Sequence, residues 1–147
     1  MAGITKVALV ALTASVAVGC GGSNSSSSSA PGFFITISNL SFSPLDLRAP
    51  PGATVTVINK DSMPHSVTSE ASPGSFTAGA VAGVQFDTGI FTGQRSFTLP
   101  SSAANGTVIP YFCNNHRNTM ATPTGTITID STAVPSSPPG GGGGGGY

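Results

Sequence analysis

Four side chains that can bind soft metal ions stand out in this chain, and three of them lie in one short segment. Cys113, His116 and Met120 fall within the run YFCNNHRNTM, whereas His65 lies far upstream. His65 and His116 are the only histidines in the 147 residues. Two imidazoles, a thiolate and a thioether form the ligand set of a trigonal copper site with a long axial sulfur ligand. Because such a set suits both Cu(II) and Cu(I), it predicts an electron-transfer centre.

The elements that must bring His65 to the other three are short strands. Segments with strand character alternate with Gly, Pro and Ser between about residues 32 and 131, and several, such as TVTVIN, place apolar residues at every second position. No helical stripe longer than two turns is present. This pattern predicts an all-β fold, a Greek-key sandwich or barrel of about seven or eight mainly antiparallel strands. The expected strands are residues 33–38, 54–59, 65–69, 84–89, 96–99, 108–112 and 124–130.

The composition excludes several classes of protein. Only 7% of the residues are charged, and five basic side chains balance five acidic ones. A chain without net positive charge cannot neutralise many phosphates, so nucleic-acid binding is not expected. Twenty Gly and twelve Pro disfavour long helices, and two cysteines cannot form a disulfide framework.

Both ends of the chain differ in composition from the middle. Residues 1–19 combine Lys6 with an apolar run that is too short to span a bilayer, and the sequence up to Cys20 resembles a bacterial lipobox. We therefore expect a signal peptide, a lipidated Cys20 and a Ser/Gly-rich linker over residues 20–31. The alternative is a signal peptide cut elsewhere, which leaves Cys20 an ordinary thiol. Residues 132–147, which include seven consecutive glycines, are expected to form a disordered tail.

Three segments around the candidate ligands resemble a known family. They are FSPLDLRAPPGATVTVINKDSMPHSV, FDTGIFTGQRSFTL, and YFCNNH followed by TGTITI. Together they resemble the cupredoxins, in particular small plastocyanin-like and amicyanin-like blue copper proteins, over residues 33–130. The resemblance implies a domain over residues 32–131 that binds one type 1 copper ion. Its ligands would be His65, Cys113 and His116, with Met120 as the axial ligand.

The ligand segments depart from the family pattern in three places. Three residues separate His116 from Met120, where the family often has two or four, and Gly125 follows Met120 by five positions rather than two. Met63 and the carbonyl of Pro64 are therefore alternative axial groups. Ser66 follows His65 where plastocyanin-like proteins tend to have Asn. This difference can alter how the ligand loop is held.

The resemblance implies an electron carrier rather than an enzyme. The protein would shuttle single electrons between exported or membrane-associated redox partners, on the periplasmic or extracytoplasmic side and anchored to the membrane by lipid. Copper nitrite reductases and multicopper oxidases need more histidines than the two present. No Ser–His–Asp set is supported, because both histidines are already assigned and no carboxylate is expected beside either; Asp61 is expected to satisfy a turn. Two alternatives stay open: a copper carrier or chaperone without redox turnover, and a metal-free sandwich that recognises partners.

Overall fold

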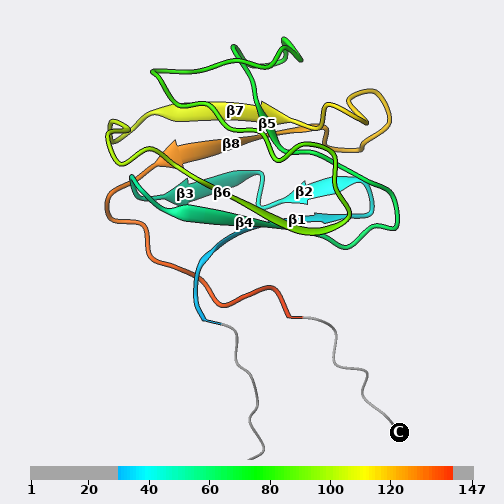
Figure 1. The fold of residues 1–147 in the computed structure, drawn as a ribbon, viewed down its shortest axis with the longest axis horizontal. Coiled ribbons are helices and arrows are strands. Elements are labelled where there is room, and N and C mark those ends of the chain that lie inside the picture. Colours follow the sequence, from blue (N-terminus) through cyan, green and yellow to red (C-terminus); the bar gives the residue numbers. More distant parts are fainter. Residues whose placement is uncertain (1–29, 141–147) are drawn as a thin grey trace, which may run out of the picture.

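The computed structural model describes residues 30–140 (Figure 1). The predicted signal peptide, the lipidation site Cys20 and most of the linker lie outside these described residues. No helix in residues 30–140 is long and apolar enough to cross a membrane.

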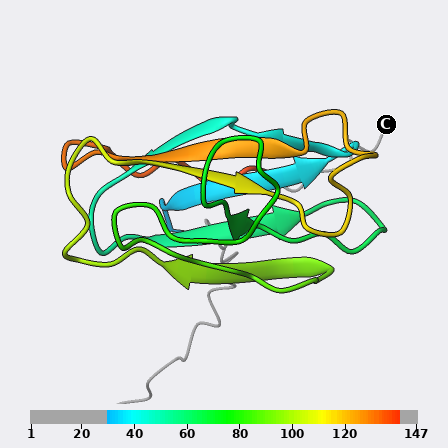
Figure 2. The same ribbon diagram turned by 90° about the horizontal axis from the view of Figure 1, so that it is seen from above.

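The described residues form two four-stranded sheets, which Figures 1 and 2 show from two directions. The first sheet has the strand order β2-β1-β4-β6, and the second has the order β3-β8-β7-β5. The all-β sandwich of seven or eight strands predicted from the sequence is therefore confirmed. The strands are β1 (Phe33–Ser38), β2 (Ser41–Ser43), β3 (Asp46–Ala49), β4 (Thr54–Asn59), β5 (Thr68–Ser69), β6 (Gly93–Thr98), β7 (Val108–Phe112) and β8 (Thr124–Ile129).

Antiparallel pairs outnumber parallel pairs, as predicted, but two parallel pairs are present. β1 pairs with β4 in parallel, and β3 pairs with β8 in parallel. Mainly antiparallel pairs were expected because parallel strands usually need a crossover helix, and the sequence indicated none. Here the chain leaves the first sheet after β2, contributes β3 to the second sheet and returns as β4 beside β1. This excursion to the opposite sheet replaces the crossover helix.

Alternating β-branched residues build the core between the sheets. Ile35 and Ile37 of β1, Val55 and Val57 of β4, and the isoleucines of β8 are all fully buried. Each such side chain contributes about 1.5–3 kcal/mol when it is removed from water. The intervening threonines and serines are less buried, which is the period-two pattern expected of strands with one face on a core.

The pairing of β5 with β7 brings the two ligand segments together. Thr68 lies opposite Phe112 in this antiparallel pair. His65 precedes Thr68 by three residues and Cys113 follows Phe112, so both lie at the same end of the sandwich. The loop of residues 114–123, yellow to orange in Figure 1, continues from Cys113 to β8. The register of one short strand pair therefore assembles the candidate site.

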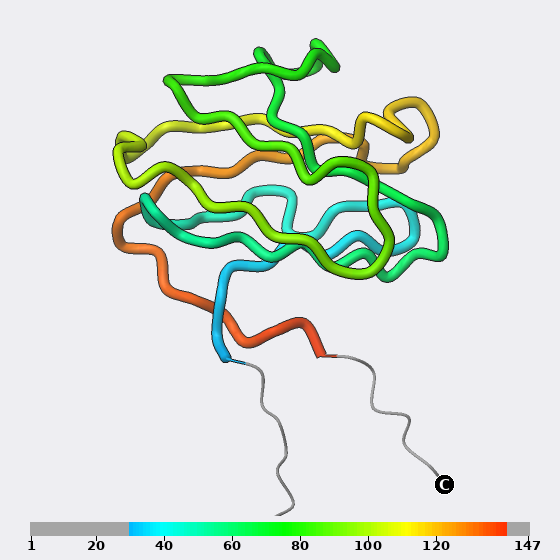
Figure 3. Tube along the Cα trace, in the orientation of Figure 1, coloured from blue at the N-terminus to red at the C-terminus, as the bar shows by residue number. Residues whose placement is uncertain are grey.

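Two connecting segments differ from the sequence expectation. Residues 84–89 form isolated bridges rather than a strand: Asp87 bridges to Thr68, and Phe86 and Thr88 are hydrogen-bonded to Ser69 and Val67, partly through side chains. The segment from β8 to Gly140 runs beside the N-terminal strand, where Ser136 and Gly32 exchange two backbone hydrogen bonds of 2.8 and 2.9 Å. Residues 132–140, for which the sequence predicted a disordered tail, therefore include a stretch that is hydrogen-bonded beside the start of β1 (Figure 3).

Candidate metal centre

Three of the four predicted ligands meet at one end of the sandwich. The Nδ1 atom of His65 lies 3.6 Å from the Sγ atom of Cys113 and 3.2 Å from the Nδ1 atom of His116. The candidate donor atoms of all three residues lie within 4.8 Å of one another. Bonds of about 2.0–2.1 Å from nitrogen and 2.3 Å from sulfur to one shared ion produce separations of this size. The cluster can therefore hold a single metal ion.

The three residues differ in their access to solvent. His65 and Cys113 are fully buried, and His116 is partly exposed. A thiolate with two imidazoles suits copper in both oxidation states, and burial on one side keeps water from that part of the site. The His116 ring is the part of the cluster that faces outward.

The side chain of His65 is fixed at both ring nitrogens. Its Nε2 atom lies 3.2 Å from the Oδ2 atom of Asp61. Because a carboxylate accepts, Nε2 carries the proton and donates it, which leaves the Nδ1 lone pair free to face Cys113. The backbone of His65 is held by two mutual hydrogen bonds with Phe91, of 2.8 and 3.0 Å. Burial lowers the pKa of His65, His116 lowers it further, and Asp61 partly opposes this. The neutral ring that results is the form that binds metal.

Asp61 has the turn role expected from the sequence and a second role that the sequence did not reveal. Its carboxylate accepts the backbone N–H groups of Asn39 and Leu40, at 2.7 and 2.9 Å. Burial raises the pKa of Asp61, but these two bonds and His65 outweigh it, so the pKa is lowered overall. The sequence analysis expected no carboxylate beside either histidine, and this contact between Asp61 and His65 corrects that expectation. The same carboxylate thus orients the ring of His65 and holds the β1–β2 turn.

The loop of residues 114–123 is closed by its own backbone and tied to the segment that holds His65. The N–H of Cys113 donates to the carbonyl of Pro123, at 3.0 Å. The side chain of Asn115 donates to the carbonyl of Pro64, at 2.9 Å, and the N–H of Asn114 donates to the hydroxyl of Ser66, also at 2.9 Å. The carbonyl of Pro64, considered above as an axial group, is engaged by Asn115.

The methionines lie in different surroundings. Met120 is 7% exposed and belongs to the hydrophobic core cluster that includes Cys113. Its backbone N–H donates to the carbonyl of His116, at 3.0 Å, which turns the loop back toward the interior. Met63 is 41% exposed. Its low exposure makes Met120 a better candidate for an axial ligand than Met63, and that role stays a prediction.

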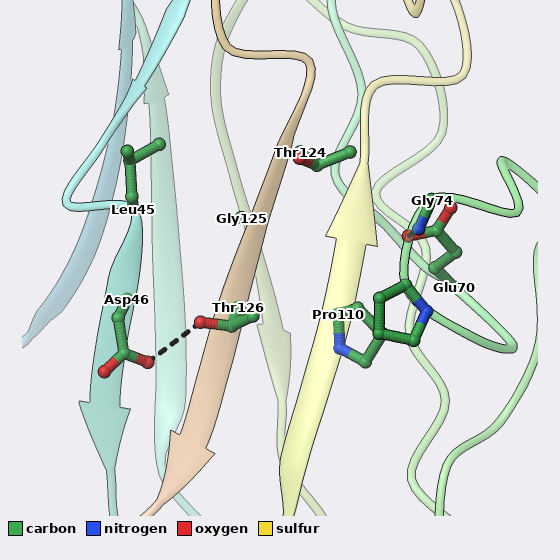
Figure 4. A pocket seen from close by; sticks show the side chains of 9 residues that line it. Leu45, Asp46, Glu70, Gly74, Pro110, Thr124, Gly125 and Thr126 are labelled. Atoms are coloured by element: carbon green, nitrogen blue, oxygen red, sulfur yellow. Dashed lines mark hydrogen bonds between the residues drawn. The ribbon is translucent and has the colours of Figure 1, made fainter.

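A pocket of about 340 Å³ lies on the second sheet, away from the metal-binding cluster (Figure 4). Asp46, Pro110 and Thr126 line it together with Glu70. The carboxylate of Glu70 accepts the backbone N–H groups of Gly74 and Phe76, and Asp46 accepts a hydrogen bond of 2.9 Å from Thr126. The acidic groups of this pocket are therefore committed to holding loops and strands.

Comparison with solved structures identifies the fold. The chain is similar to a structure described as a novel purple cupredoxin from Nitrosopumilus maritimus, with 26% sequence identity and a TM-score of 0.50. The match covers 66% of this chain and 98% of that one. A reduced Cu(I) form of an amicyanin variant matches with 18% identity and a TM-score of 0.49, over 69% of this chain and 85% of that one. A copper-containing nitrite reductase from Thermus scotoductus SA-01 matches with 17% identity and a TM-score of 0.46, over 67% of this chain but 22% of the reductase.

No family model matches the sequence, and no curated protein matches it. The two four-stranded sheets of this structure nevertheless agree with its structural similarity to the purple cupredoxin. The chain has a cupredoxin-like fold, and its cluster of His65, Cys113 and His116 fits a single copper ion.

Proposed function

We propose that this protein is a type 1 copper electron-transfer protein. The observation that carries the proposal is the meeting of His65 Nδ1, Cys113 Sγ and His116 Nδ1 within 4.8 Å at one end of a cupredoxin-like sandwich. When bound there, copper would supply a one-electron couple between Cu(II) and Cu(I).

Each residue of the cluster has a separate task in this proposal. Cys113 provides the thiolate from a fully buried position, and His65 provides Nδ1 while Asp61 holds its other nitrogen. His116 is partly exposed and offers the edge through which electrons enter and leave. Met120 is the axial ligand in this proposal, supported by its burial in the core cluster that includes Cys113.

We place the protein outside the cytoplasm, anchored by lipid at Cys20, with redox proteins as donor and acceptor. The short apolar run before Cys20 supports export. Two exposed apolar side chains flank the segments around His65: Met63 is 41% exposed and Ile90 is 59% exposed. Apolar surface of this kind beside a redox centre supports contact with a partner protein.

Visible absorption and EPR spectra of the purified chain loaded with Cu(II) test the proposal. An intense thiolate-to-copper charge-transfer band and a narrow copper hyperfine splitting are expected, together with a reversible one-electron response in voltammetry. Cys113→Ser must abolish the band, whereas Met63→Leu must leave it unchanged. A pale complex with ordinary hyperfine splitting would contradict electron transfer.

The alternative is a copper carrier that hands on its ion without redox turnover. A carrier needs ligands that an acceptor can reach, whereas His65 and Cys113 are fully buried. The burial therefore favours retention of the ion. Transfer of Cu(I) to a competing chelator separates the two functions, because a carrier releases its ion within the mixing time and an electron carrier holds it.

A further inference from the structure

A line of hydrogen-bonded side chains leads away from the ligand loop to the segment of residues 84–89. The backbone N–H of Asn114 donates to the Oγ atom of Ser66, at 2.9 Å. The Oγ atom of Ser66 lies 3.2 Å from the Oγ1 atom of Thr68, which in turn donates to the Oδ1 atom of Asp87 at 2.9 Å. Four residues from three separate segments are thus connected in series.

The direction of every bond in this line follows from the number of available protons. The Oδ1 atom of Asp87 accepts from Thr68 and also from the backbone N–H of Gly89, at 2.9 Å. A hydroxyl has a single proton to donate, and Thr68 gives its proton to Asp87. Ser66 must therefore donate to Thr68, which leaves its oxygen to accept the N–H of Asn114. All three bonds point toward Asp87.

The middle of the line is buried and its far end is exposed. Ser66 and Thr68 are 1% and 3% exposed, and Asp87 lies at the surface. A buried hydroxyl without a partner is costly, so the two hydroxyls depend on each other and on Asp87. Hydrogen bonds in series also strengthen one another, most of all when the last acceptor is a carboxylate. The oxygen of Ser66 thereby becomes a better acceptor for Asn114.

The first bond of the line acts on the peptide group between Cys113 and Asn114. This peptide begins the turn that leads to His116, whose carbonyl accepts the N–H groups of Thr119 and Met120. Fixing its plane restrains the backbone of Cys113 and the start of the turn that leads to His116. Because Ser66 also adjoins His65, one hydroxyl connects the two segments that supply the cluster.

We propose that Ser66, Thr68 and Asp87 form a directed hydrogen-bond relay whose geometry positions Cys113 and His116 for copper. The proposal rests on the copper function proposed above. The three residues are positioning residues, because none of them is a ligand. The relay occupies the place where the sequence departs from plastocyanin-like proteins, since Ser66 stands where these tend to have Asn.

Amide hydrogen exchange of the metal-free protein, followed by NMR, tests the relay directly. Ser66→Ala removes the acceptor, so the Asn114 amide is expected to exchange about twofold to tenfold faster. Thr68→Val and Asp87→Ala break the line further out and are expected to have smaller effects in the same direction. Thr68→Ser keeps the hydroxyl, so the Asn114 amide of this variant should exchange at the wild-type rate.

Thr88→Val is the matched control. The hydroxyl of Thr88 accepts the N–H of Val67, at 2.9 Å, in the same region but outside the relay. This variant should leave the exchange of Asn114 unchanged. Asp87→Ala alters only the exposed end of the relay, so it keeps the test open if a buried variant fails to fold.

Copper affinity provides the second measurement. Ser66→Ala should weaken Cu(II) binding by about tenfold to a hundredfold, with Thr68→Ser close to wild type. Unchanged Asn114 exchange in Ser66→Ala and Asp87→Ala would overturn the relay. Faster exchange with unchanged copper affinity would overturn its role in positioning the ligands. A wild-type spectrum without charge transfer would refute the proposed function, and Asn114 exchange would still decide whether the relay holds the loop.

Discussion

The carboxylate of Asp61 joins the buried ring of His65 to the turn between β1 and β2. Its Oδ2 atom lies 3.2 Å from His65 Nε2, and the two carboxylate oxygens accept the N–H groups of Asn39 and Leu40. Both turn residues have positive φ angles, of 51° and 58°. A leucine rarely adopts this conformation, and the hydrogen bonds to Asp61 offset its cost. One side chain therefore stabilises a strained turn and orients a candidate metal ligand.

We expect Asp61→Asn to weaken Cu(II) binding by about tenfold to a hundredfold and to raise the reduction potential. The substitution removes a negative charge beside the site, and this charge stabilises Cu(II) more than Cu(I). For a one-electron couple, each tenfold loss of affinity for Cu(II) relative to Cu(I) raises the potential by about 59 mV. Voltammetry and competition with a Cu(II) chelator measure the two effects.

The control for this prediction is Asp130→Asn. Asp130 follows the end of β8 that lies opposite the ligand loop, and it pairs with Arg48 at 3.3 Å. The change in net charge is the same, but the charge is remote from the cluster. Equal shifts of potential in the two variants would show that Asp61 acts only through net charge.

The two histidines should respond differently to replacement by glycine. His116 is partly exposed, so His116→Gly leaves an opening that dissolved imidazole can enter. His65 is fully buried and its ring is hydrogen-bonded to Asp61, so His65→Gly leaves a space without access to solvent. We expect added imidazole to restore the charge-transfer band of copper-loaded His116→Gly and not that of His65→Gly. Restoration of both would contradict the inferred direction of solvent access.

Met120→Leu should alter the copper spectrum and raise the reduction potential, because the thioether proposed as axial ligand is lost from a buried position. The substitution nearly conserves volume and is expected to cost less than about 1.5 kcal/mol of stability. Met63→Leu, at a position that is 41% exposed, is the matched control. Identical EPR spectra for wild type and Met120→Leu would remove Met120 from the ligand set.

The strands that were predicted accurately are those rich in β-branched and aromatic residues. Residues 33–38, 54–59 and 108–112 match β1, β4 and β7, and β8 ends one residue before the predicted end. β2 and β3 have the sequences SFS and DLRA, which carry no strand signal of their own. They are strands because of their partners: β3 pairs with the distant β8, and β2 forms an antiparallel hairpin with β1. The backbone N–H of Phe42 in β2 also donates to the hydroxyl of Thr122, at 2.8 Å. Such partners are not visible in local composition.

The cluster could be predicted because the chain offers so few candidates for it. Two histidines and one cysteine within residues 30–140 leave little choice, and their types specify the chemistry. The groups that hold them could not be predicted in the same way. Asp61, Thr68 and Asp87 are ordinary polar residues whose roles depend on distances between segments, and only the folded structure sets these.

The ring of Tyr111 explains why the second residue of β8, Gly125, has no side chain. A Cβ atom added at this position would collide with the ring edge and hydroxyl of Tyr111, which lies directly opposite Gly125 in the pairing of β7 and β8. Tyr111 is fully buried, packs edge-on against Phe42 with ring centroids 5.0 Å apart, and donates to the carbonyl of Pro44 at 3.4 Å. It therefore has little room to move aside.

We expect Gly125→Ala to lower the free energy of unfolding of the metal-free protein by about 1–3 kcal/mol. Urea denaturation measures this change, and Gly140→Ala, where an added Cβ meets nothing within 4 Å, should leave the midpoint unchanged. In a Tyr111→Leu background the obstructing ring is absent, so the cost of Gly125→Ala should shrink markedly. If the cost were the same in both backgrounds, the collision with Tyr111 could not be its cause, and the requirement for glycine would have to come from the backbone of β8.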